Sequence, residues 1–333
     1  MQNDTKHTAL VTGGAGFLGK AIVKKLIEKK IKVISFSRQY YPKLEGLRVQ
    51  QIQGDIGCKH DILKACKGVD AVFHVAAKPS LWGSYQDFYY TNVLGTKNTI
   101  TACLKNKVKQ LIYTSSPSVI FDGTDMENID ESVPYPKKYL AFYPQTKAMA
   151  EKLVKKASKS LNTIILRPHL IWGPEDNHLV PGIISRAKRL KVIGKKDDLV
   201  DTVYIDNAAD AHILASEKLF LNPSLSGNIY FISQDEPISK WKLANKFLKT
   251  AGLAPIKGYM SARTAYTAGA LFEFVYKILR IQKEPLMTRF AAKELATSHW
   301  FDISRARKDL SYYPKISIKQ GLEELKKWFD TNK

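Results

Sequence analysis

Cysteine is scarce in this 333-residue chain, which has only Cys58, Cys66 and Cys103. Their odd number and their spacing argue against a disulfide framework, a redox motif or a metal site, so we expect a protein of the reducing cytoplasm. No apolar run is long enough to span a membrane, and the opening MQNDTKHTALVTGG lacks the apolar region of a secretory signal. The sequence therefore indicates an ordinary globular protein.

Acidic residues are also few, with 31 Asp and Glu against 52 Lys and Arg, for a formal net charge of +21. Such a charge could attract nucleic acid or an acidic membrane surface. The lysines, however, are spread over nearly the whole chain, and the densest stretch is RAKRLKVIGKK at 186–196. No basic tail, zinc-finger spacing or RNA-binding aromatic signature accompanies them. We therefore predict solvated basic helix faces and no specific nucleic-acid partner.

Apolar runs alternate with stretches of helical periodicity through the first half of the chain. The runs predicted as strands are TALVT, KVISF, DAVFHVAA, KQLIYTSS, NTIILRP and GNIYFIS. This alternation predicts an α/β fold, a Rossmann-type doubly wound parallel sheet with helices on both faces. We assign residues 1–171 plus about 203–232 to this dinucleotide-binding domain. The remainder, about 172–202 plus 233–333, is predicted to form a smaller, mostly helical substrate cap.

The most apolar stretch is ARTAYTAGALFEFVYKILRI, residues 262–281, which Glu273 and Lys277 interrupt. Its polar face is too thinly basic for an interfacial anchor. We therefore expect it to pack in the core or to line an apolar pocket, with at most a peripheral membrane contact.

A glycine motif, G-x-x-G-x-x-G, places Gly13, Gly16 and Gly19 between the first predicted strand and the first helix. Glycine lets the backbone turn tightly and approach a pyrophosphate, and the helix N-terminus offers free N–H groups. In this strand–turn–helix context the motif predicts a dinucleotide site rather than a turn without a ligand.

The second predicted strand ends at Ser37 and Arg38, without an acidic residue. An acid at this point holds the ribose 2′-hydroxyl of NAD, whereas an Arg accommodates the 2′-phosphate of NADP. The charge favours NADP (NADPH) over NAD, against the alternative that Arg38 is an ordinary surface residue. Asp55, in the stretch GDI that follows what looks like another strand before DAVFHVAA, either accepts from an adenine amine or caps the next helix.

Tyr143 and Lys147 stand four residues apart in YPQTKAMAEKL, and on a helix they would share one face. A neighbouring ammonium lowers the pKa of a tyrosine, which suits the pair to exchanging a proton with a substrate hydroxyl or carbonyl. Pro144 suits the first helical position, so Tyr143 should lie at the helix entrance. A third polar group is expected from Ser115, Ser116 or Ser118, at the carboxyl end of a strand.

The chain resembles the extended short-chain dehydrogenases/reductases over nearly its whole length, on TGGAGFLG, HVAA, TSS, YPQTK and RPHLIWGPED in that order. The closing segment, from PLMTRF to KKWF, is similar to the 3β-hydroxysteroid dehydrogenase/isomerase branch. SSPSVIFDG is similar to sterol C4-decarboxylating dehydrogenases and to bacterial 2-alkyl-3-oxoalkanoate reductases.

The resemblance implies roles for individual residues. It selects Ser116 as the third catalytic group, with Ser115 second, and it makes Asn92 a support for Lys147. Taken alone, Asn92 is typical of a helix N-cap. It also implies a homodimer through two helices against the sheet. The implied cofactor contacts are Gly13, Gly16, Phe17, Leu18, Gly19, Ser37, Arg38, Asp55, Ile56, Ala76, Ala77, Tyr143, Lys147 and Pro168.

We therefore predict an oxidoreductase of EC 1.1.1 type that interconverts a secondary alcohol and a ketone. The substrate would be largely apolar, either a 3-oxo/3-hydroxy acid or a sterol-like molecule, and Lys78 or His169 is the candidate to bind a carboxylate. His74, His169 and His178 lack partners at ligand spacing and are predicted to be structural. One alternative is an NAD-dependent nucleotide-sugar epimerase or dehydratase, which needs a more polar pocket. The other is a cofactor-sensing binding protein without catalysis, which would commonly lack the Tyr or the Lys.

Overall fold

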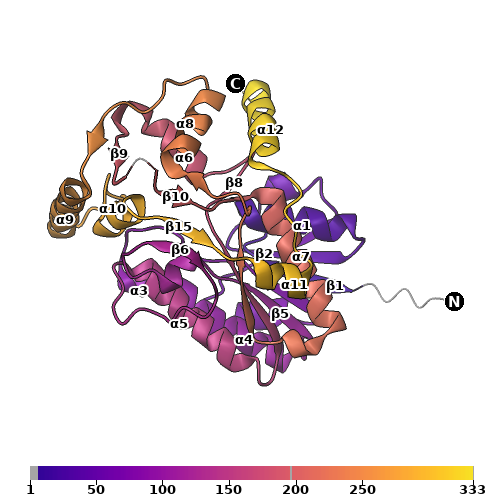
Figure 1. The fold of residues 1–333 in the computed structure, drawn as a ribbon. Coiled ribbons are helices and arrows are strands. Elements are labelled where there is room, and N and C mark those ends of the chain that lie inside the picture. Colours follow the sequence, from indigo (N-terminus) through magenta and orange to yellow (C-terminus); the bar gives the residue numbers. More distant parts are fainter. Residues whose placement is uncertain (1–6, 196, 333) are drawn as a thin grey trace.

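The computed structural model describes residues 7–195 and 197–332 (Figure 1). Its centre is a parallel sheet of seven strands in the order β12-β7-β5-β4-β1-β2-β3. This order reverses between β1 and β4, as in a doubly wound fold, and it confirms the predicted class. The strands are β1 (Thr8–Thr12), β2 (Lys32–Ser37), β3 (Val49–Gln53), β4 (Ala71–His74), β5 (Gln110–Thr114), β7 (Asn162–Pro168) and β12 (Asn228–Ile232).

Helices cover both faces of the sheet because successive strand residues point to opposite sides. Ala9 and Val11 of β1 belong to the core that α1 and α7 complete, whereas Leu10 lies in the opposite core with α2, α4 and α5. Buried on both faces, the strands are apolar runs rather than alternating ones. The covering helices are α1 (Phe17–Glu28), α7 (Ile205–Leu221), α2 (Lys59–Ala65), α4 (Gly95–Lys105) and α5 (Phe142–Ala157).

The helix predicted around Asn92 is longer and less regular than its sequence suggested. It runs from α3 (Tyr85–Phe88) through a π-helical turn, η2 (Tyr89–Leu94), into α4. Helix α5 also begins two residues early, at Phe142, so Pro144 occupies its third position rather than its first. That position is still within the first turn, where a backbone N–H has no intrahelical partner.

The rest of the chain is a mixture of helices and short strands. Strand β6 pairs with β15 although it precedes Tyr143 in sequence, so the predicted dinucleotide domain contributes to this region. The proposed domain boundaries stay a prediction. The longer helices are α6 (Leu179–Ser185), α8 (Lys240–Thr250), α9 (Ala262–Ile278), α10 (Arg289–Leu295), α11 (Ser304–Leu310) and α12 (Ile318–Thr331). The short strands are β6 (Met126–Ile129), β8 (Ile171–Trp172), β9 (Val192–Ile193), β10 (Leu199–Val200), β11 (Val203–Tyr204), β13 (Ile238–Ser239), β14 (Tyr259–Met260) and β15 (His299–Phe301). The 3-10 turns are η1 (Pro42–Leu44), η3 (Pro117–Ile120), η4 (Ala187–Arg189) and η5 (Pro223–Leu225).

Helix α9 meets one of the two expectations for residues 262–281, that of lining an apolar cavity. Only Ala265 and Gly269 of this helix are buried, and Gly269 packs against the backbone of Thr288. Leu271 and Phe274 are 61% and 63% exposed. Burial in the core is therefore limited to Ala265 and Gly269. The predicted lining of an apolar cavity is confirmed by Ala268 and Phe272 on the inner face of α9. Within residues 7–195 and 197–332, every helix is too short or too polar to cross a bilayer.

Candidate active site

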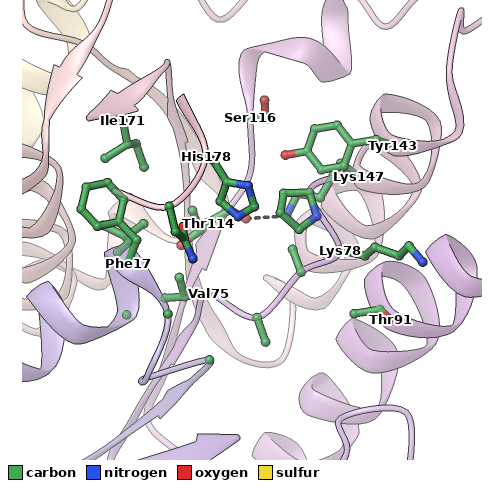
Figure 2. Close-up of a pocket in the computed structure, with 18 of the residues that line it drawn as sticks. Phe17, Val75, Lys78, Thr91, Thr114, Ser116, Tyr143, Lys147, Ile171 and His178 are labelled. Carbon is green, nitrogen blue, oxygen red and sulfur yellow. Dashed lines mark hydrogen bonds between the residues drawn. The ribbon is translucent and has the colours of Figure 1, made fainter. Parts of the chain in front are cut away.

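A cavity of about 960 Å³ runs along the carboxyl ends of β1, β2, β4 and β5. Figure 2 shows Phe17 on one side of it and Tyr143 on the other. Each residue predicted to contact the cofactor lines this cavity, as does Ser116, so the tertiary structure gathers positions from Gly13 to Pro168. Asn92 is the predicted site residue that does not line it.

The glycine turn has no room for side chains. Gly13 has a φ of +68°, and a Cβ there would lie 3.0 Å from the Cα atom of Ala76. A Cβ on Gly19 would lie only 2.1 Å from the Gly13 carbonyl oxygen. Gly16 is the N-cap of α1 and supplies no side-chain cap, which leaves the first N–H groups of that helix for a ligand. This cradle fits a pyrophosphate.

The far end of the cavity lies where β2 and β3 finish. The Ser37 hydroxyl is buried and without a hydrogen-bond partner among the described residues, while Arg38 is exposed and lines the cavity. A buried polar group without a partner is unfavourable, so this hydroxyl fits a ligand that supplies one. Asp55 accepts a 2.8 Å hydrogen bond from the Gly57 N–H. Because the N-cap of α2 is Cys58, the helix-cap alternative for Asp55 is wrong.

Ser116 and Tyr143 meet at the other end of the cavity. Ser116 follows β5 and caps η3, where its Oγ accepts from the Ser118 N–H at 3.2 Å and lies 3.0 Å from the Ser118 Oγ. The Ser116 hydroxyl also lies close enough to the Tyr143 phenol to influence the pKa of that group. Figure 2 shows both hydroxyls on the same side of the cavity. Two hydroxyls arranged in this way can contact one substrate oxygen together.

The charges around Tyr143 differ from the sequence expectation. Burial raises the pKa of Tyr143 to about 12, although the nearby Ser116 hydroxyl opposes the shift. The Lys147 ammonium instead donates to the Thr114 carbonyl oxygen at 2.6 Å and lies over the Tyr113 ring. Burial lowers the pKa of Lys147 to about 7, against the attraction of Glu151. The predicted lowering of the Tyr143 pKa is therefore wrong in this structure, and the phenol is a neutral acid at pH 7.

Ser115, the second choice for the catalytic serine, belongs to a buried ionic network. Its hydroxyl donates to Glu151, which also pairs with Arg167 at 2.6 Å and accepts from the Tyr135 hydroxyl at 2.7 Å. Both Glu151 and Arg167 are almost fully buried. Ser115 therefore supports α5 from beneath, and Ser116 is the serine that lies beside Tyr143.

Asn92 is buried within the π-helical turn, so the N-cap interpretation is wrong. Its Oδ1 accepts from the Lys78 N–H at 2.8 Å, and its Nδ2 donates to the Thr146 Oγ1 at 3.1 Å. Thr146 directly precedes Lys147 on α5. Asn92 thus ties the loop after β4 to the helix that carries Lys147.

Two histidines near the cavity, His74 and His169, are buried and hydrogen-bonded. His74 is buried between Thr12 and Thr96, at 2.7 and 3.0 Å, and burial lowers its pKa to about 3, as a structural role requires. His169 hydrogen-bonds the Asp201 carbonyl oxygen at 2.7 Å, and burial lowers its pKa to about 4. The described residues include no cluster of His, Cys, Asp and Glu that could hold a metal.

Neither candidate for binding a carboxylate is a free cation in this cavity. His169 is neutral at pH 7, although it lines the wall. Lys78 pairs with Asp87 at 3.2 Å, and Figure 2 shows its side chain directed away from Tyr143. The sequence-based suggestion for these two residues is therefore not supported.

A second cavity, of about 940 Å³, adjoins the first and is mainly apolar. The two share wall residues from β4–α3, β7–β8, α6 and α10, which makes them neighbours. The shared residues are Leu81, His169, Leu170, His178 and Glu294. The apolar wall of the second cavity includes Leu179, Ile183, Leu243, Phe247 and Phe272.

Sequence reasoning missed Phe290 and Glu294, which α10 brings into the first cavity. Burial raises the pKa of Glu294 to about 7, against the attraction of Lys240. The Lys240 ammonium itself donates to three carbonyl oxygens, of Glu294, Leu295 and Thr297. Glu294 stands 147 residues from Lys147, and no local pattern marks it; only the resemblance of the closing segment pointed to this region.

A glycine cradle at the switch point of a doubly wound sheet, with a Tyr–Lys helix beside it, defines an extended short-chain dehydrogenase/reductase. Residues 10–260 match the 3-beta hydroxysteroid dehydrogenase/isomerase family. The chain therefore belongs to that family, and it is an oxidoreductase whose family implies a nicotinamide cofactor.

Individual relatives agree with this assignment. A 2-alkyl-3-oxoalkanoate reductase of Shewanella oneidensis is 46% identical over 329 residues, which cover 96% of this chain and 85% of the relative. A decarboxylating sterol-4-alpha-carboxylate 3-dehydrogenase of Mus musculus is 34% identical over 321 residues, which cover 94% of this chain and 88% of the relative. The structure of the UDP-glucuronic acid 4-epimerase of Bacillus cereus with NAD has a TM-score of 0.75 at 23% identity. The match covers 98% of this chain and 99% of the epimerase chain. At that identity the epimerase shares the fold alone.

Proposed function

We propose that this protein is an NADPH-dependent reductase of 3-oxo acids that carry long alkyl chains. The observation that carries the proposal is the apolar second cavity of about 940 Å³, which adjoins the cavity that Tyr143 lines. Apolar walls bind alkyl chains through the hydrophobic effect and give a sugar nucleotide few polar contacts. The 2-alkyl-3-oxoalkanoate reductases at 46% and 44% identity support the same substrate class.

The proposed chemistry adds a hydride and a proton to a ketone. The glycine cradle would hold the pyrophosphate of the cofactor, and a nicotinamide bound near Tyr143 would supply the hydride to the carbonyl carbon. Tyr143 donates its phenolic proton to the carbonyl oxygen, and its pKa of about 12 keeps that proton in place until it is needed. Ser116 holds the same oxygen by a hydrogen bond. The product is the secondary alcohol, and the phenolate then regains a proton.

Lys147 and Asn92 are proposed to position these groups. Lys147 lies one turn from Tyr143 on α5, at the carboxyl end of β5, where it would hold the nicotinamide ribose hydroxyls. Asn92 fixes the start of α5 through Thr146. Preference for NADPH is inferred from Ser37 and Arg38, since a guanidinium favours a 2′-phosphate and no carboxylate follows β2.

The test is consumption of NADPH by the purified protein with a panel of ketones. We expect turnover of long-chain 2-alkyl-3-oxo acids and little with UDP-sugars. Preferred turnover of a sterol-like 3-ketone would move the protein toward the sterol dehydrogenases, which are 34% identical. A protein that purifies with NAD tightly bound and interconverts UDP-sugars would refute the proposal.

A further inference from the structure

The outer face of α9 is an unusual surface for a helix of a globular protein. Leu271, Phe274, Val275 and Ile278 are 61%, 63%, 37% and 62% exposed, and Leu279 is 63% exposed. The spacing of the first four, at i, i+3, i+4 and i+7, puts them on one side of the helix. Contiguous exposed apolar side chains of this kind indicate a binding surface.

The opposite side of the same helix faces the substrate cavity. Ala268 and Phe272 line the second cavity, and Gly269 packs on Thr288. Helix α9 is thus one wall of the apolar cavity, apolar on its inner and outer sides. Figure 1 shows it at the edge of the molecule, far from the central strands.

A basic segment lies beside this surface. Arg186, Lys188, Arg189 and Lys191 are all exposed, and all four line the second cavity. They directly precede β9, whose Val192 pairs with Tyr259 of β14, and β14 ends two residues before α9 begins. The basic segment and α9 therefore emerge from one two-stranded sheet. The positive charge that is sparse on the polar face of α9 itself is increased by a part of the chain about 80 residues earlier.

We propose that α9 and the basic segment 186–191 dock the protein on an anionic phospholipid bilayer. Phe274 and its neighbours would enter the acyl boundary, while the arginines and lysines contact phosphate headgroups. The second cavity would then open toward the lipid phase, from which an apolar substrate can enter. The docking itself stands without the reductase function, because it depends only on the exposed surface.

Charge argues for a bilayer over a second copy of the chain as the occupant of this face. A two-fold contact through α9 would bring two sets of exposed cations, 186–191 and Lys277, Arg280 and Lys283, close together. In a chain of net charge +21 that repulsion opposes association, whereas anionic headgroups neutralise it. The homodimer predicted from sequence is placed on helices against the sheet and does not use α9.

The test is co-sedimentation of the full chain with phosphatidylcholine vesicles that contain or lack phosphatidylglycerol. We expect binding to the anionic vesicles that weakens as salt is raised. The variant Leu271→Ser with Phe274→Ser and Ile278→Ser should reduce partitioning by about tenfold or more. The matched control is Phe220→Ser with Leu221→Ser on α7, which are 57% and 76% exposed and should bind like the wild type.

A second variant tests the basic segment. Arg186→Glu with Arg189→Glu should weaken binding to anionic vesicles by about fivefold for each charge removed. The control, Lys64→Glu at the end of α2 with Lys67→Glu in the turn after it, should not weaken binding. Circular dichroism and thermal melting show whether each variant is folded. The proposal is overturned if the wild type stays in the supernatant with anionic vesicles, or if the triple serine variant still sediments. It is also overturned if that variant turns a dimer into a monomer in light scattering, since the face would then be a protein contact.

Discussion

The Lys147 ammonium donates a 2.6 Å hydrogen bond to the Thr114 carbonyl oxygen, at the end of the strand that leads to Ser116. The lysine is therefore anchored to the sheet rather than to the phenol one turn away. Burial dominates the pKa of both side chains, which it raises for Tyr143 and lowers for Lys147. A protonated phenol suits a reaction that begins by donating a proton to a ketone.

Removing the phenol hydroxyl should abolish reduction and leave the cofactor site intact. We expect Tyr143→Phe to lower kcat by about 10²–10⁴-fold, because the proton donor is lost. Fluorescence titration should show unchanged NADPH binding. Tyr139→Phe is the control, since the Tyr139 hydroxyl is buried, has no hydrogen-bond partner among the described residues and lies off the cavity. Retained activity in Tyr143→Phe would disprove its role as the acid.

Burial of Lys147 should make the stability of the protein rise with pH. The folded pKa of about 7 lies below the unfolded value of 10.5, so between these values the unfolded chain binds more protons and stability increases. The slope is at most about 1.4 kcal/mol per pH unit. Urea unfolding at pH 7 and pH 9 should show a gain of up to about 2–3 kcal/mol over the Lys147→Met variant. An equal gain in the variant would contradict the lowered pKa.

Glu294 should make binding of an acidic substrate depend on pH. Its pKa of about 7 leaves it largely neutral below pH 7, whereas above that pH a carboxylate would repel a substrate carboxylate in the same cavity. We expect KM for 3-oxo acids to rise above pH 7 in the wild type. The rise should be absent in Glu294→Gln, and absent for the wild type with an uncharged ketone. Identical KM profiles of wild type and variant would show that Glu294 does not face the substrate.

Removing the positive charge after β2, and then adding a negative one, should change the preference between NADPH and NADH. A charge-assisted hydrogen bond contributes about 1.5–3 kcal/mol, so Arg38→Ser should lower the preference for NADPH over NADH by about ten- to a hundredfold. Adding Ser37→Asp should move the preference further toward NADH by supplying an acceptor for the ribose hydroxyl. Arg48→Ser is the control, because Arg48 is exposed and does not line the cavity. The ratio of kcat/KM for the two cofactors is the measurement.

The buried network under α5 should be sensitive to the loss of one partner only. Glu151→Ala leaves the Arg167 guanidinium buried without its carboxylate, which costs about 3–5 kcal/mol in the free energy of unfolding. Combining Glu151→Leu with Arg167→Met removes both charges and should recover much of that loss. Glu217→Ala, which breaks the exposed pair with Lys29, should cost less than about 1 kcal/mol. Urea unfolding of these variants provides the comparison.

Local patterns in the sequence determined the dinucleotide half of the molecule. The turn at Gly13 and Gly19 excludes side chains for reasons of backbone geometry, and the spacing of Tyr143 and Lys147 places them one helical turn apart in any α-helix. Strand–helix alternation likewise fixed the class of the sheet. Each of these features depends on residues that are close in sequence, which is why reasoning from sequence found them.

The tertiary structure alone decided the electrostatics and the substrate side. Lys147 was expected to lower the pKa of Tyr143, but packing gave its ammonium a carbonyl oxygen and buried both groups. Glu294 enters the cavity only because α10 folds back over the sheet, and the basic segment 186–191 meets α9 only through the pairing of β9 with β14. Burial and charge at a site depend on chain segments far apart in sequence, and no local pattern encodes where those segments meet.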